Sequence, residues 1–163
     1  MCGLVALLSD SPIDSRLVIR MRDRLIHRGP DHGGLWVRDD KKLAFGHRRL
    51  AIIDVSAEAN QPMQSEDGRF VITYNGEIYN YLELRETLAR AGHTFRTGSD
   101  TEVLLASYMH WGVECLSRLN GMFAFALWDA VQHRLFVARD RFGEKPLFWA
   151  RPKDGCVAFA SEM

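Results

Sequence analysis

The sequence lacks an excess of charge of either sign, because its 163 residues include 21 basic and 21 acidic side chains. Without a basic stripe to neutralise phosphates or to bind anionic lipid, nucleic-acid and membrane-surface roles are disfavoured. No apolar run approaches the roughly 20 residues that span a bilayer, and no secretory leader of the usual form is present. We therefore expect no nucleic-acid partner, no membrane association and a cytoplasmic location.

Cysteine is also scarce, which limits disulfides and metal sites. Cys2, Cys115 and Cys156 are odd in number and far apart, so they predict neither a disulfide framework nor a zinc site built on cysteine pairs. We expect no metal and no cofactor in this chain, and at least one free thiol. The length and apolar content are those of one domain with its own core, here residues 2–163.

Apolar runs separated by turn residues predict strands at both ends of the chain. The run from Gly3 to Leu8 is typical of a buried strand and places Cys2 at its start. Residues 70–74 are rich in β-formers and lead into Asn75-Gly76, which we interpret as a tight turn that ends a strand. Further strands are predicted over 122–128, 135–138, 147–149 and 157–160.

Three helices are predicted between these strands. The first carries Leu17, Met21 and Leu25 on one face and ends at the turn Gly29-Pro30. The other two have starts that resemble capping boxes, formed by the pairs Asn80 with Glu83 and Ser99 with Glu102. Helices in the middle of the chain with strands on both sides favour an α+β layered domain with mostly antiparallel sheets.

Cys2 is the first candidate for chemistry because of its position. Removal of Met1 would leave one residue holding both a thiol and a free α-amine. An α-amine has a pKa of about 8, which suits it to accept the thiol proton near neutral pH without a histidine. The alternative is that Cys2 is only a small residue at an ordinary chain start, and a single cysteine does not decide between the two.

Two charged segments follow. Residues 27–31 form a Gly-Pro turn that holds charges of both signs, and its alternative reading is an ordinary turn. Residues 47–54 place Arg48 and Arg49 ahead of an apolar run that we interpret as a strand. A guanidinium there could form a bidentate pair with a carboxylate, although adjacent arginines on strands are more often solvated.

The segment from Tyr74 to Asn80 supplies donors and an acid. Asn75 offers a side-chain amide and Gly76 a backbone N–H, the two kinds of donor that build an oxyanion hole. Glu77 and Asp100 could hold an ammonium group, whereas each acid alone is more often a cap or a surface charge. Together these groups match glutamine, which needs a nucleophile at its amide and opposite charges for its carboxylate and its amine.

At these residues the sequence resembles the class II glutamine amidotransferases with an N-terminal nucleophile, and within them the glutaminase domains of asparagine synthetases. The resemblance covers essentially the whole chain. The matching segments are 1–3, 27–31, 47–54, 75–80, 97–102, 121–129, 139–146 and 160–163. Pro30-Asp31 after His-Arg-Gly, and the run Asn-Gly-Glu-Ile-Tyr-Asn, favour the asparagine synthetase branch over amino-sugar and purine relatives, and Cys2 sets the chain apart from β-lactam synthetases.

The resemblance implies a four-layer αββα N-terminal-nucleophile hydrolase sandwich of two mostly antiparallel sheets between helical layers. It implies that this domain hydrolyses L-glutamine to glutamate and ammonia through a thioester, as part of a ligase. The roles it implies are as follows: Cys2 is the nucleophile, Asn75 and Gly76 form the oxyanion hole, Arg49 binds the substrate carboxylate, the backbone of Ile52 and Ile53 lines the pocket, Glu77 and Asp100 lie near the substrate amine, and Arg28 supports the site.

The same resemblance implies a longer parent protein. An asparagine synthetase continues into an ATP-using domain, so we expect this chain to be a fragment, with ATP and magnesium bound in a C-terminal synthetase domain that is its partner. A homodimer is a further candidate assembly. Two alternatives stay open: a glutaminase domain that serves another amidation, of a sugar acid or a peptide, and a silent regulatory domain that keeps the fold.

Overall fold

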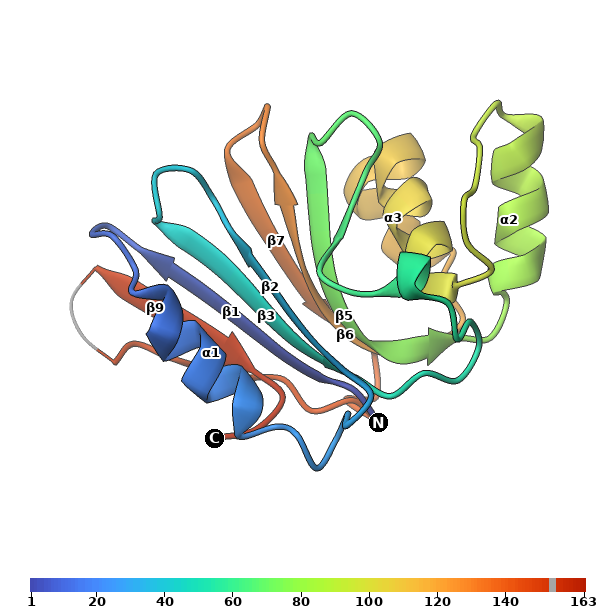
Figure 1. Ribbon diagram of the computed structural model, residues 1–163. Coiled ribbons are helices and arrows are strands. Elements are labelled where there is room, and N and C mark those ends of the chain that lie inside the picture. The colour runs from blue at the N-terminus through green and yellow to red at the C-terminus, as the bar shows by residue number, and fades with distance from the viewer. Residues whose placement is uncertain (153–154) are drawn as a thin grey trace.

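The computed structural model describes residues 1–152 and 155–163, which form two antiparallel sheets packed face to face between helices (Figure 1). The first sheet has the order β2-β3-β1-β9-β8 and the second the order β4-β5-β6-β7. The strands of the first sheet are β1 (Gly3–Ser9), β2 (His32–Val37), β3 (Leu43–Arg49), β8 (Phe148–Ala150) and β9 (Cys156–Ala160). Those of the second are β4 (Met63–Gln64), β5 (Phe70–Ile78), β6 (Gly121–Asp129) and β7 (Arg134–Arg139).

Helices cover the outer face of each sheet. Helix α1 (Ser15–Asp23) lies on the first sheet, while α2 (Tyr81–Arg90) and α3 (Asp100–Trp111) cover the second (Figure 1). Two short 3₁₀ helices, Ala57–Ala59 and Gly112–Ser117, complete the elements. The predicted α+β class and its four layers are therefore confirmed, with α1 alone forming the helical layer on one side.

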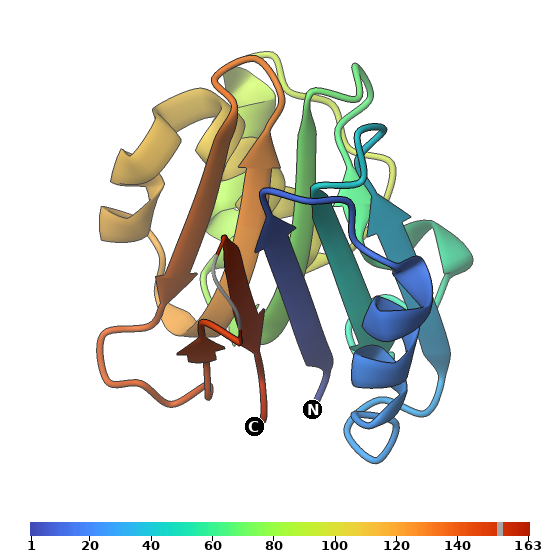
Figure 2. The same ribbon diagram turned by 90° about the vertical axis from the view of Figure 1, so that its left-hand side faces the viewer.

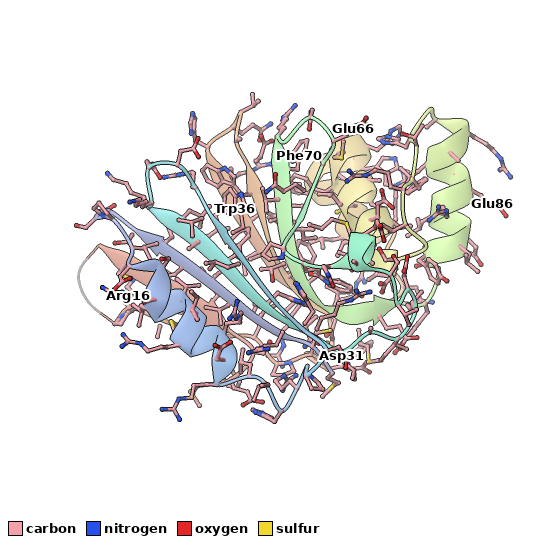
Figure 3. The ribbon with its side chains drawn as sticks, in the orientation of Figure 1. Arg16, Asp31, Trp36, Glu66, Phe70 and Glu86 are labelled. Atoms are coloured by element: carbon pink, nitrogen blue, oxygen red, sulfur yellow. The ribbon has the colours of Figure 1, made fainter. Side chains whose placement is uncertain are left out.

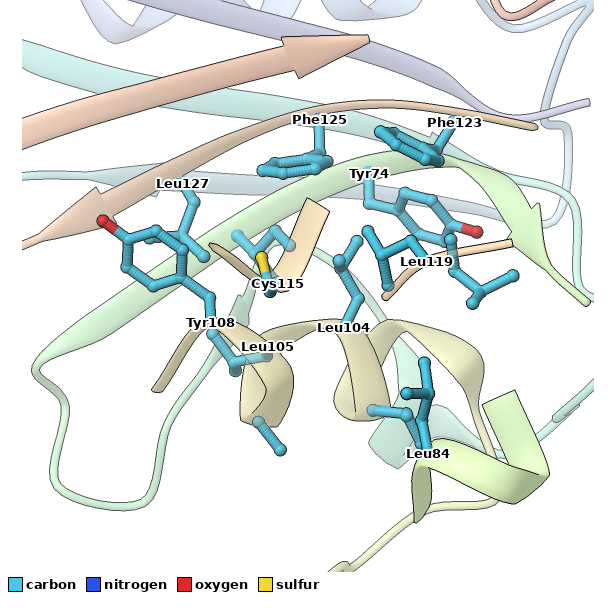
Figure 4. Packing of buried hydrophobic residues seen from close by; sticks show 14 of the residues in the cluster. Tyr74, Leu84, Leu104, Leu105, Tyr108, Cys115, Leu119, Phe123, Phe125 and Leu127 are labelled. Carbon is cyan, nitrogen blue, oxygen red and sulfur yellow. The ribbon is translucent and has the colours of Figure 1, made fainter. Parts of the chain in front are cut away.

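Three apolar cores hold the layers together. Between the sheets, Phe45 and Leu43 of β3 meet Val71 of β5, and Trp36 extends into the same space (Figure 3). On the outer side of the second sheet, Leu104 of α3 packs among aromatic side chains of β5 and β6 (Figure 4). Each buried leucine or phenylalanine contributes roughly 1.5–3 kcal/mol, so these layers fix the sheets against each other.

The two chain ends lie side by side in the first sheet. Figure 2 shows the N-terminus beside the C-terminus, where β1 begins and β9 ends. Ser161 joins the two chain ends through two hydrogen bonds to Leu4. Its side-chain oxygen accepts from the Leu4 N–H at 3.0 Å, and its own N–H donates to the Leu4 carbonyl at 3.1 Å. The start of β1 is therefore held from both flanks, by β3 and by the segment after β9.

The predicted turn at Asn75-Gly76 is wrong. Both residues lie inside β5, where Asn75 pairs with Ala124 and Gly76 with Phe123. Glycine is needed for space rather than for a turn, because a Cβ on Gly76 would lie 2.4 Å from the Met122 carbonyl oxygen. The sequence signal was ambiguous, since glycine also serves strands where another backbone approaches closely.

The predicted apolar strand at 50–53 is also wrong. Strand β3 ends at Arg49, and the following residues form a loop in which the Ile52 side chain is 71% exposed. The Arg49 guanidinium donates to the carbonyls of Asp54 and Ser56, which folds the chain back on itself and prevents it from extending the strand.

The helix predictions need smaller corrections. Helix α1 ends at Asp23, before the predicted stop at Gly29, and its buried residue is Val18, whereas Leu17 is exposed. Tight turns with three-residue spacing continue from there. The predicted cap at Ser99 is confirmed, because its hydroxyl accepts from the Glu102 N–H at 3.2 Å.

The second predicted cap, at Asn80, is wrong. Its side chain makes no bond to its own helix. Instead it bridges to another segment, accepting from the Asn120 N–H at 3.0 Å and donating to the Arg118 carbonyl at 2.9 Å.

Candidate active site

A cavity of about 140 Å³ opens where β1 begins, at the ends of β3 and β5 and the start of α3. All but one of the residues expected at the site line it: Cys2, Arg49, Ile52, Ile53, Asn75, Gly76, Glu77 and Asp100. These residues come from four separate stretches of sequence, so only the sandwich brings them together. The exception, Arg28, lies behind the cavity.

Cys2 sits at the cavity with its thiol against the loop after β3. The Leu50 N–H points at Sγ from 3.4 Å, and Sγ lies 3.7 Å from the Leu50 carbonyl oxygen. Burial raises the pKa of the Cys2 thiol, while the bond to Leu50 and the positive charges of the chain terminus and of Arg49 act in the opposite direction. A thiol in this position needs a nearby base to become a thiolate at neutral pH.

Arg28 supports Cys2 from behind. Its Nε donates to the Cys2 carbonyl at 2.9 Å, and its Nη1 pairs with Glu162 at 2.8 Å. His27 also lies 3.0 Å from the same Glu162 carboxylate. The guanidinium thus joins Cys2, the residue before β1, to Glu162 after β9, and so helps to fix the position of Cys2.

Arg49 is 7% exposed and is held by the loop that follows it. Nη1 donates to the Ser56 carbonyl at 2.7 Å and to the Asn60 side-chain oxygen at 2.8 Å, and Nη2 donates to the Asp54 carbonyl. Within residues 1–152 and 155–163, no ion pair involves Arg49. Its charge is therefore fixed at the cavity and available for an anion.

Arg48 points the other way, as expected for the next residue of a strand. Its Nη2 lies 2.5 Å from the Asp23 carboxylate, at the end of α1 and away from the cavity lining. Of the two adjacent arginines, Arg49 therefore lines the cavity, and Arg48 holds α1 to the sheet.

Asn75 and Gly76 contribute donors from β5. Asn75 is 2% exposed, and its side-chain Nδ2 finds no hydrogen-bond partner among the described residues. A buried amide N–H without a partner costs about 1–3 kcal/mol, so its position calls for an acceptor that enters the cavity. Gly76 lies so close to β6 that a side chain would not fit, and its backbone N–H is therefore not covered by one.

Asp100 and Glu77 bring negative charge to the cavity. Asp100 is the first residue of α3, and its Oδ2 accepts from the Tyr74 hydroxyl at 2.7 Å and from the Ile78 N–H at 3.0 Å. Burial raises the pKa of Asp100, although those bonds and its place at a helix N-terminus favour the anion. Glu77 is exposed at the rim of the cavity.

Several lining residues were missed by sequence reasoning. Gln61 accepts from the Tyr74 N–H at 2.6 Å and donates to the Thr101 hydroxyl at 3.2 Å, so it joins β5 to α3 beneath the cavity. Lys145 and Met122 also line it. No local pattern marked these residues, although Met122 and Lys145 fall in two of the segments, 121–129 and 139–146, that carried the resemblance.

His47, in another of those segments, is entirely buried between the sheets. Its Nε2 donates to the Tyr74 carbonyl at 2.9 Å, and burial lowers its pKa to about 3. It is therefore a neutral core residue that holds β3 to β5, and it does not line the cavity.

Metal and membrane features can be stated for the part of the chain that the structure describes. There, no group of three or more His, Cys, Asp or Glu side chains is arranged to hold a metal ion. No helix in that part is both long enough and apolar enough to cross a bilayer. The groups that the cavity offers are a thiol, amide donors and opposite charges.

Comparisons with known proteins show the family to which the chain is similar. The family model described as a glutamine amidotransferase domain matches residues 1–163. An asparagine synthetase (glutamine-hydrolysing) of Bacillus subtilis is 47% identical over 99% of this chain, and one of Arabidopsis thaliana is 44% identical over all of it. The chain spans 26% and 28% of those two relatives.

A solved structure shares the fold. The glutamine phosphoribosylpyrophosphate amidotransferase of B. subtilis superposes with a TM-score of 0.86 at 25% identity, over 99% of this chain and 42% of that one. The two-sheet sandwich is thus the fold of a known amidotransferase. With its sequence matched from end to end by the family model and its cavity built from these residues, the chain belongs to the glutamine amidotransferase domain family.

Proposed function

We propose that this domain hydrolyses the side-chain amide of L-glutamine to glutamate and ammonia, with Cys2 as the nucleophile. The observation that carries the proposal is the meeting of three kinds of group at one cavity: the Cys2 thiol, the Asn75 amide, which has no partner within residues 1–152 and 155–163, and the opposite charges of Arg49 and Asp100. A silent domain that only keeps the fold has no need for this combination.

The reaction begins with activation of the thiol. Once Met1 is removed, the Cys2 α-amine accepts the thiol proton, directly or through a water, and Sγ attacks the amide carbon of glutamine. Burial raises the pKa of the Cys2 thiol, so an adjacent base is required near neutral pH. Arg28 supports this step by bonding to the Cys2 carbonyl, which orients the residue that carries both groups.

The negative charge that develops on the amide oxygen is received by the Asn75 side chain and the Gly76 N–H. The Asn75 amide is buried and has no partner among the described residues, so it need not break another hydrogen bond or turn when the oxyanion forms. Donors that are already in place in this way give strong transition-state stabilisation. Loss of one such donor typically costs about 10²–10³ in kcat. The carbon–nitrogen bond then breaks, and ammonia leaves with the proton held by the α-amine.

The other end of glutamine is recognised by its two charges. Arg49 binds the α-carboxylate, while Asp100 and Glu77 bind the α-ammonium group. The backbone of Ile52 and Ile53 borders the pocket on the loop side. The remaining thioester between Cys2 and the glutamyl group is hydrolysed by water, which releases glutamate and restores the thiol.

We further propose that the ammonia serves ATP-dependent amidation in a longer protein, most specifically of aspartate to asparagine. The names of the relatives and the small share of them that this chain spans support a separate synthetase domain, and ATP and magnesium would bind there. Amidation of a different acceptor, a sugar acid or a peptide, is the alternative, and the sequence that adjoins residue 163 in the parent gene distinguishes the two.

The direct test is ammonia and glutamate release from glutamine by the protein and its Cys2→Ala and Cys2→Ser variants. Intact mass first verifies that Met1 has been removed, because a retained Met1 would place the base in a peptide bond. We expect both variants to lose hydrolysis and to keep the circular dichroism melt of the parent. Hydrolysis that survives in Cys2→Ala would refute the mechanism, and no glutamate from a verified Cys2 N-terminus would favour a silent domain.

A further inference from the structure

Lys145 lines the cavity together with Cys2, and the proposed reaction assigns no role to its charge. It is 4% exposed, and its Nζ lies 3.1 Å from the Met1 thioether sulfur. Among the described residues it forms no ion pair. A thioether is a weak acceptor, so this buried ammonium is poorly compensated, which is costly unless the charge is used.

Several hydrogen bonds hold the turn that carries Lys145. The Asp140 carboxylate accepts the backbone N–H of Phe142 at 3.1 Å, of Glu144 at 2.9 Å and of Lys145 at 3.0 Å. The Arg139 Nε donates to the Lys145 carbonyl at 2.7 Å. The backbone of Lys145 is therefore held in place, and its side chain is directed from this turn to the cavity.

The partner of Lys145 disappears on maturation. Met1 is bonded directly to the nitrogen of Cys2, and both residues line the cavity with Lys145. When Met1 is cleaved, the thioether leaves and the Cys2 nitrogen becomes an α-amine in the same region. The ammonium of Lys145 then faces the space that the Met1 side chain occupied, in the cavity that Cys2 also lines.

The other charges around Cys2 are held by groups other than its amine in the free protein, which is the state that both tests below report. Arg28 pairs with Glu162, and Arg49 donates to the carbonyls of the loop that follows it. Asp100 accepts from the Tyr74 hydroxyl and the Ile78 N–H, Glu77 is exposed to solvent, and Asp54 accepts the N–H groups of Ser56 and Gly98. Tyr74 is held protonated, since burial raises its pKa well above the usual range. His27 faces the same Glu162, and Lys145 is left as an uncompensated cation.

We propose that Lys145 is a positioning residue whose ammonium group disfavours protonation of the Cys2 α-amine, so that this amine is free to accept the thiol proton. The inference rests on the proposed function, because it concerns the base of that reaction. A like charge nearby favours the neutral form of an amine, and a shift of about one pH unit is typical of such neighbours. An α-amine starts from a pKa near 8, so such a shift changes the fraction available as base at neutral pH several-fold.

Two measurements test this. The first is the pH dependence of kcat/KM for glutamine, whose acidic limb reports the essential base of the free enzyme. The variants are Lys145→Met, which removes the charge, and Lys145→Arg, which keeps it, with Lys145→Gln as a second neutral variant if the methionine protein melts early. Lys42→Met, in the hairpin at the far end of β3, is the matched control.

The second measurement does not need glutaminase activity. In a Cys2→Ala background with Met1 removed, the α-amine is titrated by competitive acetylation with acetic anhydride at a series of pH values, and the N-terminal peptide is quantified by mass spectrometry. The same Lys145 and Lys42 variants are compared. This separates the inference from the proposed function, because it reads the amine even in a protein that hydrolyses nothing.

We expect the neutral Lys145 variants to move both the acidic limb and the amine titration up by about one pH unit, with Lys145→Arg and Lys42→Met unchanged. An amine titration that does not move in the neutral variants overturns the proposal, whatever happens to activity. A fall in kcat/KM that is equal at every pH would likewise overturn it, and would make Lys145 a structural residue only. Failure of the parent protein to release glutamate would refute the proposed function and leave the amine titration to decide on Lys145.

Discussion

Replacing Arg49 with alanine should weaken the use of glutamine far more than replacing its neighbour Arg48. Arg49 is a buried cation at the cavity with no ion pair among the described residues, and three oxygens of the following loop aim its guanidinium. Removing one partner of a buried charge pair costs about 2–5 kcal/mol. At about 1.36 kcal/mol per tenfold, kcat/KM should fall roughly 30-fold to several thousand-fold.

The structural contribution of Arg49 can be separated from substrate binding by a second substrate. 4-Aminobutanamide is glutamine without its α-carboxylate, so it cannot pair with Arg49. The parent protein should strongly prefer glutamine, and Arg49→Ala should lose most of that preference while it keeps what activity it has toward the analogue. A loop disordered by loss of the guanidinium would instead reduce both substrates alike.

Arg48→Ala provides the control on the adjacent residue. It removes the bond to Asp23 that joins β3 to α1, so a lower melting temperature is expected with little change in kcat/KM. Equal losses of kcat/KM at both arginines, or an Arg49→Ala protein that discriminates the two substrates as the parent does, would show that the carboxylate is bound elsewhere.

Three further outcomes are expected. Gly76→Ala should destabilise the fold by at least about 1–3 kcal/mol in urea unfolding, because its Cβ would meet the Met122 carbonyl at 2.4 Å, whereas Gly98→Ala, with its nearest neighbour at 3.5 Å, should be nearly neutral; equal stability of the two would contradict the packing argument. His47 has a pKa lowered to about 3 from an ordinary 6.5, so the unfolded chain takes up the proton first as pH falls, and stability should drop by roughly 2 kcal/mol between pH 7.5 and 5, a slope that His47→Gln should lose. ATP and aspartate should change neither the rate nor the product of the isolated chain, and asparagine formed by it alone would refute the separate synthetase domain.

Much of the site could be recognised in the sequence because its residues occur in short, compact segments. Cys2 stands at the start of an apolar strand, and Asn75, Gly76 and Glu77 are consecutive, so their candidate roles could be recognised from short local segments. The local backbone conformation was predicted less accurately from the sequence. The Asn-Gly dipeptide predicted a turn, whereas pairing with β6 holds both residues in a strand, which is a tertiary contact that overrides a local preference.

Residues that depend on long-range packing were not found. Gln61 works by joining β5 to α3, and Lys145 reaches the cavity only because Asp140 fixes the turn before it. Neither residue stands in a periodic or capping pattern. Sequence spacing carries no information on such contacts, because their partners lie on other elements of the fold.

The sequence by itself determined the layered α+β class and supplied the candidate nucleophile and the candidate charged groups that suit glutamine, since strand and helix periodicity and residue chemistry are local properties. Only the tertiary structure decided which way each side chain faces. Successive residues of β3 point to opposite faces of the sheet. Arg49 therefore lines the cavity, while Arg48 lies on the face that α1 covers and pairs with Asp23. Burial in that sandwich also leaves the Asn75 amide without a partner among the described residues and raises the pKa values of Cys2 and Asp100, and burial exists only once distant segments have packed together.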